Sequence, residues 1–331
     1  MNYKISPAPT YRTGRPSLPK RGMGTEIANL PTRLLKSPNR KSVFNQRGSA
    51  LIITLLLITV LVGLTVDFVY EVYIDTSSFS NWSYAQKASL MARSGQNLSS
   101  LFLKEINKVS YTTENGLELP VERDFGPNSF LLIKLEDENS KFNINGIIYQ
   151  NGLSNTAELL SLKKLLEYLN INPTLGDVIA DWIDPDNEPR QGGDESNSKN
   201  SFFWSIDELR LIEEIDDETY NKIAPYITIY GNSRINVNTA PLPVLLSMSD
   251  DITEELAQRI IDYRNSTPFE DESHIVRVSG LETIGQKLQG KKITVKAETF
   301  RVTATAMMNE ITRIIESVMN DSMQILYWKE R

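Results

Sequence analysis

The sequence contains no cysteine and a single histidine, and these absences exclude several classes of protein. Without cysteine there is no disulfide, no thiol catalysis and no cysteine-based zinc or iron–sulfur site. A site of several histidines is impossible, and a His-dependent triad would have to use His274. Its acidic neighbourhood, FEDESHIVRV, is typical of a surface or helix-start histidine. No glycine-rich phosphate loop is present, so we do not expect an enzyme.

The chain has almost no acidic residues before its apolar run, and fewer basic than acidic residues after it. Residues 1–48 hold ten Lys/Arg and one acid, a net charge of +9, which leaves 25 basic and 41 acidic residues beyond them, a net charge of −16. Gly48–Val66 separates the two parts with 19 uncharged residues, and about 20 apolar helical residues span a bilayer. Because positive charge stays on the cytoplasmic side, we expect the acidic bulk to be periplasmic. Its charge argues against binding nucleic acid through phosphates.

Three interpretations of the apolar run compete: a cleaved secretory signal, a plain signal anchor and a prepilin-type N-terminus. A secretory signal has about 7–15 apolar residues and a small-residue cleavage site, whereas this run is longer and leads into Asp67. Its border, Gln46–Leu51 (QRGSAL), resembles the prepilin peptidase site of type IV pilins and type II secretion pseudopilins. The resemblance implies a cut between Gly48 and Ser49, with methylation of the new N-terminus. Met23 is an alternative start.

The fifth residue of the implied mature chain narrows the resemblance. Most members of the family carry a glutamate there, whereas this chain has Ile53. That difference resembles the minor pseudopilin K branch of the general secretion pathway. In a filament the glutamate would neutralise the methylated amine of a neighbouring subunit, so isoleucine is expected in a subunit at the tip. An unpaired carboxylate would be costly there.

The rest of the chain alternates between helical and strand patterns. The segment after Asp67 has no proline and continues as one long amphipathic helix, with a stripe of apolar residues at helical spacing. The stripe consists of Ala88, Met91, Ala92, Leu98, Leu101, Phe102 and Ile106. Strands are predicted at Ser129–Leu135, Lys141–Ile147, Lys296–Met307, Ile311–Val318 and Gln324–Trp328, the last three as an antiparallel meander. Short helices are predicted at Leu159–Leu169, Leu175–Ile183, Ile206–Ile215, Glu218–Ala224, Pro243–Met248 and Glu254–Tyr263.

These elements predict an α+β fold interrupted by a helical region. Resemblance to pseudopilin K implies a pilin-like arrangement: a long N-terminal transmembrane and amphipathic helix on an antiparallel sheet, split by a large all-α insertion with helix-hairpin-helix-like units. We expect a basic leader at 1–48, a transmembrane part at 49–66, a first pilin-like part at 67–149, the insertion at 150–293 and C-terminal strands at 294–331.

The stretch Ala180–Glu195 concentrates carboxylates. Asp184, Asp186 and Glu188 alternate, and Glu195 is the twelfth residue counted from Asp184, as in an EF-hand calcium loop. Pro189 stands where that loop requires glycine, so we do not assign an EF-hand. A solvated acidic turn is the alternative interpretation. Resemblance to the calcium-carrying segment of pseudopilin K favours calcium, and the expected ligands are Asp184, Asp186, Glu188, Asp194 and Glu195. Asp181 is a further candidate, for which an exposed position on its helix is the alternative interpretation.

The segment from Ile235 to Leu281 resembles the helix-hairpin-helix modules of DNA uptake proteins, which hold phosphates with backbone amides. At the first hairpin this chain has Ser249–Thr253 (SDDIT), and a similar fragment at Ser205–Pro225 has Glu-Ile-Asp-Asp. Aspartates there would repel phosphate, so we interpret both hairpins as scaffolds kept for packing. A competence-type pilin that binds DNA is the alternative function.

Together the residues and the resemblance predict a structural assembly protein. Resemblance implies a minor pseudopilin at the tip of the type II secretion pseudopilus, for protein export across the outer membrane. The implied partners are minor pseudopilins I and J, prepilin peptidase and the bacterial inner membrane, crossed once with the N-terminus cytoplasmic, and no nucleic acid.

Overall fold

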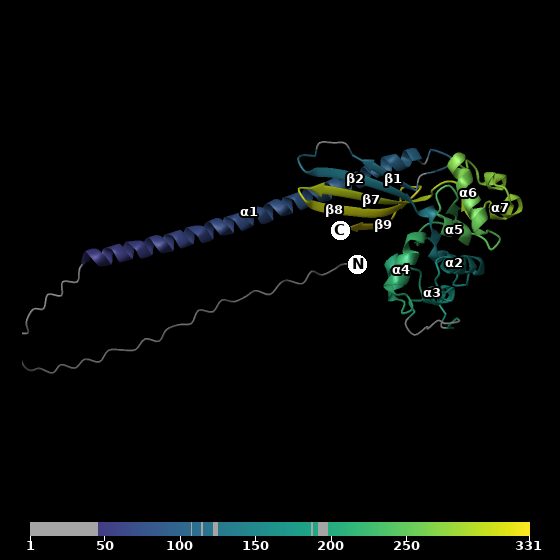
Figure 1. Cartoon of the computed structure of the whole chain (residues 1–331), viewed down its shortest axis with the longest axis horizontal. Helices are drawn as coiled ribbons and strands as arrows, with labels where there is room; N and C mark the ends of the chain where they lie inside the picture. The colour runs from purple at the N-terminus through teal and green to yellow at the C-terminus, as the bar shows by residue number, and fades with distance from the viewer. Residues whose placement is uncertain (1–45, 107, 114, 122–124, 187, 191–197) are drawn as a thin grey trace, which may run out of the picture. The chain divides into compact units, whose positions relative to one another are not determined.

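The computed structural model describes residues 46–106, 108–113, 115–121, 125–186, 188–190 and 198–331 (Figure 1). The predicted leader lies outside this part of the chain except for its last three residues. Contacts between Cα atoms divide the chain into two compact units, Met1–Asp67 and Phe68–Arg331.

One helix, α1, runs from Gln46 to Ile106, as the absence of proline predicts. Within the second unit, Ala88 and Ala92 of the predicted apolar stripe are fully buried, and so is Leu103, which the prediction did not include. Leu101 was also predicted on the stripe, but it is 57% exposed, because the stripe narrows to the face that meets the sheet. Gly95 lets the helix approach the sheet closely, since a Cβ at this position would lie 2.9 Å from a methyl carbon of Leu131.

The sheet has five antiparallel strands in the order β1-β2-β7-β8-β9. The strands are β1 (Gly116–Pro120), β2 (Ser129–Asp137), β7 (Thr299–Met308), β8 (Ile311–Asn320) and β9 (Ile325–Glu330). Ser129 is paired with Met308 and Asp137 with Phe300. The strand before the helical region therefore lies beside the strand after it, and the predicted meander β7-β8-β9 is confirmed.

One face of the sheet packs on α1 and the other carries more polar residues. Burial alternates along β7, where Val302, Ala304 and Ala306 are fully buried and the residues between them are half-buried. Ala306 joins Ala88 and Ala92 in one apolar cluster. Period-2 alternation thus places the sheet core against the helix.

The strand predicted at Lys141–Ile147 is mostly wrong. Only Phe142–Asn143 forms a strand, β3, and Ile144–Ile147 is a 3-10 helix, η2. The side chain of Asn143 accepts a hydrogen bond from the N–H of Asn145 and caps this turn, because asparagine side chains compete with ladder hydrogen bonds.

The region between β2 and β7 is mainly helical but not all-α, which corrects the prediction. It contains two short parallel ladders, β3 with β4 (Ile227–Thr228) and β5 (Ile235–Asn236) with β6 (Ile293–Thr294). Its helices are η1 (Glu138–Ser140), α2 (Thr156–Tyr168), α3 (Leu175–Ile183), η4 (Ile206–Leu211), α4 (Asp217–Ile223), η5 (Ala224–Tyr226), α5 (Leu242–Ser247), α6 (Glu254–Ser266), η6 (Glu272–Arg277) and α7 (Glu282–Leu288). The segment predicted as a helix at Ile206–Ile215 is the shorter 3-10 helix η4, and α7 and β1 were missed.

Two separate apolar cores fill this region. The first gathers buried residues between Phe142 and Ile227, and the second gathers residues between Ile235 and Val295. Each parallel ladder joins a segment near the start of its core to one near its end, so the two cores follow each other along the chain.

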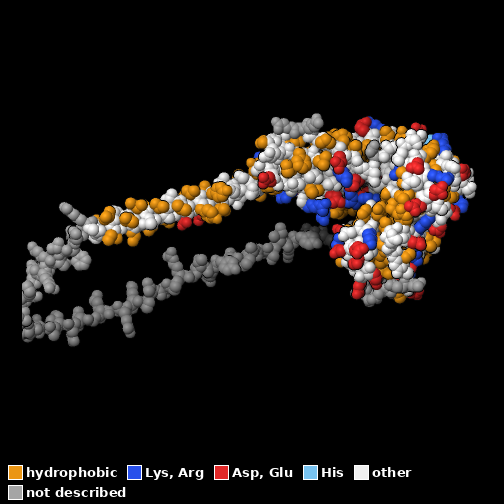
Figure 2. Space-filling view, in the orientation of Figure 1, with side chains coloured by type: hydrophobic (Ala, Val, Ile, Leu, Met, Phe, Trp, Pro, Cys, Tyr) orange, Lys and Arg blue, Asp and Glu red, His pale blue; other side chains and the backbone are white. Residues whose placement is uncertain are grey.

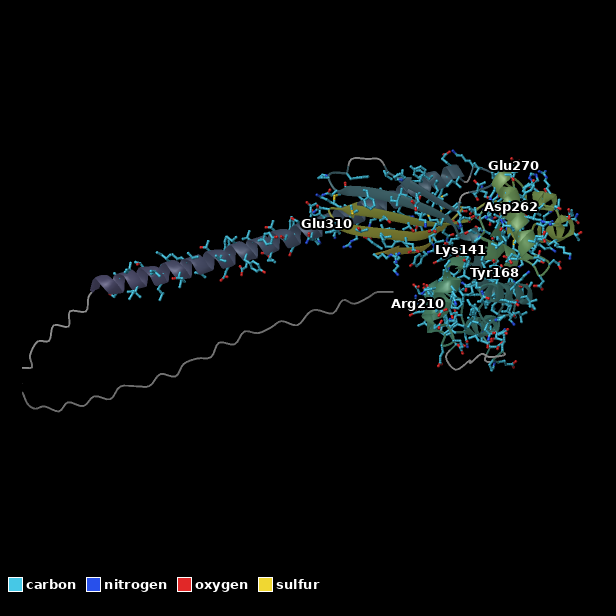
Figure 3. All side chains as sticks on the ribbon, viewed as in Figure 1. Lys141, Tyr168, Arg210, Asp262, Glu270 and Glu310 are labelled. Carbon is cyan, nitrogen blue, oxygen red and sulfur yellow. The ribbon has the colours of Figure 1, made fainter. Side chains whose placement is uncertain are left out.

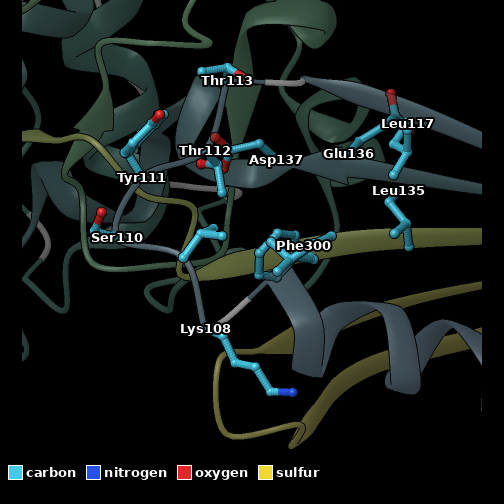
Figure 4. Close-up of a pocket in the computed structure, with 12 residues that line it drawn as sticks. Lys108, Ser110, Tyr111, Thr112, Thr113, Leu117, Leu135, Glu136, Asp137 and Phe300 are labelled. Carbon is cyan, nitrogen blue, oxygen red and sulfur yellow. The ribbon is translucent and has the colours of Figure 1, made fainter. Parts of the chain in front are cut away.

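A buried polar network connects the second core to the end of the sheet. The carboxylate of Asp137, at the end of β2, accepts hydrogen bonds from Asn236 Nδ2 (2.8 Å) and Thr239 Oγ1 (2.7 Å), and Asn236 Nδ2 also contacts Thr112 Oγ1 (2.9 Å). Asp137 lines one end of a cavity of about 590 Å³ beside Thr112 and Phe300 (Figure 4). Burial raises the pKa of Asp137 to about 6, although these hydrogen bonds and that from the Asn139 N–H oppose the shift.

Candidate functional site

Hydrophobic side chains gather along the visible face of the N-terminal part of α1 (Figure 2). Its large apolar side chains from Leu51 to Val66 are between 53% and 68% exposed, and the helix is long and apolar enough to cross a membrane. The hydroxyls of Thr54 and Thr65 donate to the carbonyls of Leu51 (2.9 Å) and Leu61 (2.7 Å). These polar groups are therefore satisfied within the helix, as a hydrocarbon environment requires.

The predicted processing residues lie in the first turns of this helix. A Cβ added to Gly48 would meet nothing within 4 Å, so packing within the chain does not explain this glycine. Ile53 follows one turn after Ser49 and is 60% exposed. The three positions therefore share an apolar helix surface that is open to other molecules.

The acidic segment begins where α3 ends. Asp181, the further candidate, is 1% exposed and Asp184 is fully buried, so the alternative interpretation of Asp181 as a simply exposed residue does not hold. The guanidinium of Arg190 contacts Asp181 Oδ1 (2.5 Å) and Asp184 Oδ2, and its backbone N–H donates to Asp181 Oδ2 (2.8 Å). The fold thus brings the carboxylates of Asp181 and Asp184 together on the guanidinium of Arg190. Helical spacing did not predict this contact of Asp181, because spacing does not show which neighbour covers a residue.

Asp184 is the residue of this cluster with unused bonding capacity. Its Oδ1 atom is buried and has no hydrogen-bond partner among the described residues. Burial raises its pKa, and the hydrogen bond from Arg190 opposes that shift. A buried carboxylate oxygen without a partner among the described residues fits an oxygen-bound cation.

Of the other predicted ligands, the structure describes Asp186 and Glu188 but not the last two. Asp186 accepts a hydrogen bond from the N–H of Glu188 (2.9 Å) and is exposed. Asp194 and Glu195 lie outside the described residues. Within the part of the chain that the structure describes, no three acids or histidines converge on one point.

Polar groups of the predicted hairpin at Ser249–Thr253, and of the loop before α7, bond within the chain. In the other predicted hairpin, Ser205–Pro225, Asp216 caps α4 by accepting a hydrogen bond from the N–H of Thr219 (2.8 Å). Lys164 Nζ on α2 donates to the carbonyls of Ser249 (2.6 Å) and Ile252 (2.8 Å) in the loop before α6. In the loop before α7, Gly280 has a φ of +93°, and its N–H donates to the Glu282 carboxylate at 3.1 and 3.2 Å. Because the Gly280 N–H already donates to the Glu282 carboxylate, it is not a free donor for phosphate. Asp262 on α6 and Glu270 in the segment after it are exposed acids (Figure 3).

The helix and sheet define the class of this protein: an α+β protein whose long, apolar N-terminal helix carries an antiparallel sheet. Two models of the family "Type II secretion system (T2SS), protein K" match residues 140–232 and 235–296. The chain belongs to this family. Each matched segment contains one of the two apolar cores, so each core corresponds to one domain of the family.

Curated relatives carry the same description, and one of them covers most of the chain. Type II secretion system protein K of Pseudomonas aeruginosa is 23% identical over 301 residues, covering 83% of this chain and 88% of the relative. The protein of the same name from Dickeya chrysanthemi is 28% identical over 137 residues, 38% of each chain. A chain in the crystal structure of the GspK-GspI-GspJ complex of the enterotoxigenic Escherichia coli type 2 secretion system superposes with a TM-score of 0.63. It is 17% identical, and the match covers 77% of this chain and 99% of that chain, so it shows the shared fold.

Proposed function

We propose that this protein is a minor pseudopilin at the tip of the type II secretion pseudopilus, a structural component for protein export across the outer membrane. The observation that carries the proposal is the long apolar helix packed on a sheet that is split by the two protein K domains. Filament subunits need such a helix to assemble side by side, and a bulky region at one end of the sheet suits a terminal position. The DNA-binding alternative has no support from the hairpin geometry.

The proposed partners are minor pseudopilins I and J, because the similar solved chain comes from a complex of GspK, GspI and GspJ. The experiment is co-expression of the full chain with pseudopilins I and J of the same host, followed by purification from membranes in mild detergent. A stable complex is expected. If the chain purifies alone while I and J still associate with each other, the proposed function is wrong.

The apolar part of α1 is proposed as a single anchor in the inner membrane. The +9 charge before it stays in the cytoplasm and the acidic bulk lies in the periplasm, since positive charges resist translocation. In the Gly48→Leu variant, which should keep its leader, protease added to spheroplasts should digest the part after Asp67 and spare a tag at the N-terminus. The opposite pattern would contradict this orientation.

Prepilin peptidase is proposed to cut between Gly48 and Ser49. Support comes from Gly48 itself, which costs about 1 kcal/mol of helix stability relative to alanine yet fills no tight space. Intact mass of the membrane form should give a methylated Ser49 N-terminus. Gly48→Leu should block the cut, while Gly63→Leu, at another open helix position, should be processed normally. Any other mature N-terminus defeats this proposal.

Ile53 is proposed to mark the tip position. Its exposed apolar side chain replaces the carboxylate that would pair with the amine of the next subunit. An Ile53→Glu variant that assembles within filaments, seen by cross-linking to major subunits on both sides, supports the proposal. Unchanged assembly of the variant removes its basis.

Calcium is proposed to bind at the acidic segment and to fix the loop after α3. Asp184, with Asp181 beside it, would supply the buried oxygens, and Asp186, Glu188, Asp194 and Glu195 the remaining ones. The Asp184 Oδ1 atom, which has no hydrogen-bond partner among the residues that the structure describes, supports the fit. Arg190 would then give up contacts that it now makes with both aspartates.

The test compares thermal unfolding of the full chain in detergent with excess calcium and with chelator. Calcium at 100 times its Kd stabilises by about 2.7 kcal/mol, so the Tm should fall by several degrees when it is removed. Asp184→Asn should abolish this difference, while Glu270→Gln, an exposed acid on another part of the chain, should keep it. Identical melting curves with and without chelator refute calcium binding.

A further inference from the structure

The last strand of the sheet has a free edge. β9 pairs with β8 on one side, and among the described strands none pairs with its other side. Ile314 and Arg331 exchange both backbone hydrogen bonds, at 2.8 and 2.9 Å. Because alternate residues of an antiparallel strand point their backbone groups in opposite directions, the N–H and C=O groups of Trp328 and Glu330 point outward.

The side chains along this edge are unusual for a surface strand. Ile325, Leu326 and Trp328 are 54%, 44% and 45% exposed, and Lys329 and Arg331 are exposed as well. An edge lysine discourages two copies of the same strand from pairing, since their charges would meet. The same charge attracts a strand that carries acids, because opposite charges across a strand pair are stabilising.

A cleft with a cavity of about 240 Å³ lies next to β9. Its lining includes four cations (Lys141, Arg301, Lys329 and Arg331), two acids (Asp207 and Glu316) and three tyrosines (Tyr220, Tyr230 and Tyr327). Figure 3 shows Lys141 in this part of the molecule. Cations therefore outnumber acids in the lining of a protein part whose net charge is strongly negative.

The charges within the cleft are not equally satisfied. Arg301 contacts both Glu316 and the buried Glu138, and Lys141 lies 3.4 Å from Glu138. Glu316 also forms an ion pair with Arg331, at 3.7 Å. Lys329 has no ion-pair partner in the described part of the chain, although it is paired across the ladder with Glu316. The unsatisfied positive charge thus lies on the free edge itself.

We propose that the β9 edge accepts an extended acidic segment of a neighbouring pseudopilus subunit as a sixth strand. Backbone groups of the segment would bind the outward N–H and C=O groups of Trp328 and Glu330, its acids would meet Lys329 and Arg331, and its alternate side chains would cover Trp328. This rests on the proposed function. The occupant is a neighbouring subunit because this edge lies beside α1: Arg93 on that helix contacts Glu330 (2.9 Å) and lies 5.9 Å from the Trp328 ring, so a subunit packed along α1 would reach the edge. A neighbour anchored by its own helix is held at high effective concentration, which a weak edge site needs.

The first test measures binding of synthetic peptides to the full chain in detergent micelles. One fluorescent peptide of about nine residues alternates Glu and Thr, and its counterpart carries Lys in place of Glu. Fluorescence anisotropy should show that the acidic peptide binds about tenfold more tightly or better. Equal affinity for both peptides, or no binding of either, overturns the proposal.

A second test uses backbone chemistry at a position whose N–H points away from β8. Trp328→Pro removes that outward donor and leaves the pairing with β8 intact, whereas Trp328→Ala removes the same side chain and keeps the donor. The proline variant should bind the acidic peptide about tenfold more weakly than the alanine variant. Lys329→Glu should also weaken binding, while Lys222→Glu, an exposed lysine on α4, should not. Equal affinities within either pair of variants overturn the proposal.

The third test identifies the occupant in cells and uses the absence of native cysteine. Trp328→Cys should cross-link through a thiol-to-amine reagent to pseudopilin I or J, and Trp204→Cys, 74% exposed elsewhere, should not. Cross-links to a second copy of this chain or to an exported protein, or no product, overturn the choice of occupant. If the unmodified chain fails to co-purify with I and J, the proposed function is wrong, and the peptide measurements still report on the edge itself.

Discussion

The buried carboxylate of Asp137 should make the stability of this protein depend on pH in a way that one substitution removes. Asp137 is 2% exposed, and burial raises its pKa from 3.8 to about 6. A raised acid pKa means that the folded state binds the proton more tightly than the unfolded chain. Stability contributed by protonation is therefore present below pH 3.8 and lost as pH rises through about 6.

The magnitude follows from the size of the shift. A change of about 2 units corresponds to about 3 kcal/mol at 1.36 kcal/mol per unit. Asp137→Asn removes the titration, so the free energy of unfolding of the wild type relative to the variant should fall by up to about 3 kcal/mol between pH 4 and pH 7. Any loss of hydrogen bonding in the variant is independent of pH, so it changes the free energy of unfolding by the same amount at pH 4 and at pH 7.

The assay is urea unfolding of the full chain in detergent, followed by tryptophan fluorescence at several pH values. Trp182 is buried and reports on the first core, and circular dichroism reports on the whole. Taking the difference between the two proteins cancels the other titrating groups. If the two curves of stability against pH are parallel from pH 4 to pH 7, the reasoning about Asp137 is refuted.

Two further predictions concern packing and charge. Gly95→Ala places a Cβ 2.9 Å from a methyl of Leu131 and should cost about 1–3 kcal/mol, measured by the same unfolding assay. Gly63→Ala, where space is open, should leave the unfolding of Phe68–Arg331 unchanged, and equal effects would contradict close packing at Gly95. Arg301→Met leaves the carboxylate of Glu138 buried without its guanidinium and should cost about 3–5 kcal/mol. Arg210→Met breaks an exposed pair and should cost about 0–1 kcal/mol, so a similar loss in both variants would argue against a special role for the buried pair.

Much of the architecture could be predicted because it depends on local patterns. The proline-free run predicted α1, and strict alternation predicted β7, β8 and β9 with their antiparallel order. The prediction at Lys141–Ile147 failed because an alternating pattern was outweighed by a side-chain cap at Asn143. Hydrophobic period indicates a strand only where no nearby asparagine offers the backbone another partner.

The acidic segment shows a second limit of sequence reasoning. Spacing along the chain selected Asp184, and the structure gives that residue a buried oxygen without a partner. It did not identify Asp181 as buried, since helical periodicity cannot say which neighbour covers a polar position. Arg190 belongs to the cluster for the same reason, because the turn after α3 brings its side chain back to the helix.

The sequence by itself determined the apolar run, the opposite charges on its two sides, the processing motif and the family, because these depend on the order of residues along the chain. Tertiary structure decided which polar groups are buried and which strand edge stays open. Burial by segments distant in the sequence raises the pKa of Asp137, and the hydrogen bonds that oppose this shift come from Asn236 and Thr239, about a hundred positions away. β9 is an edge strand because it pairs with β8 on one side and with no other described strand on its other side. Both properties arise from contacts between distant segments, and burial and pairing of that kind are fixed only when the whole chain packs.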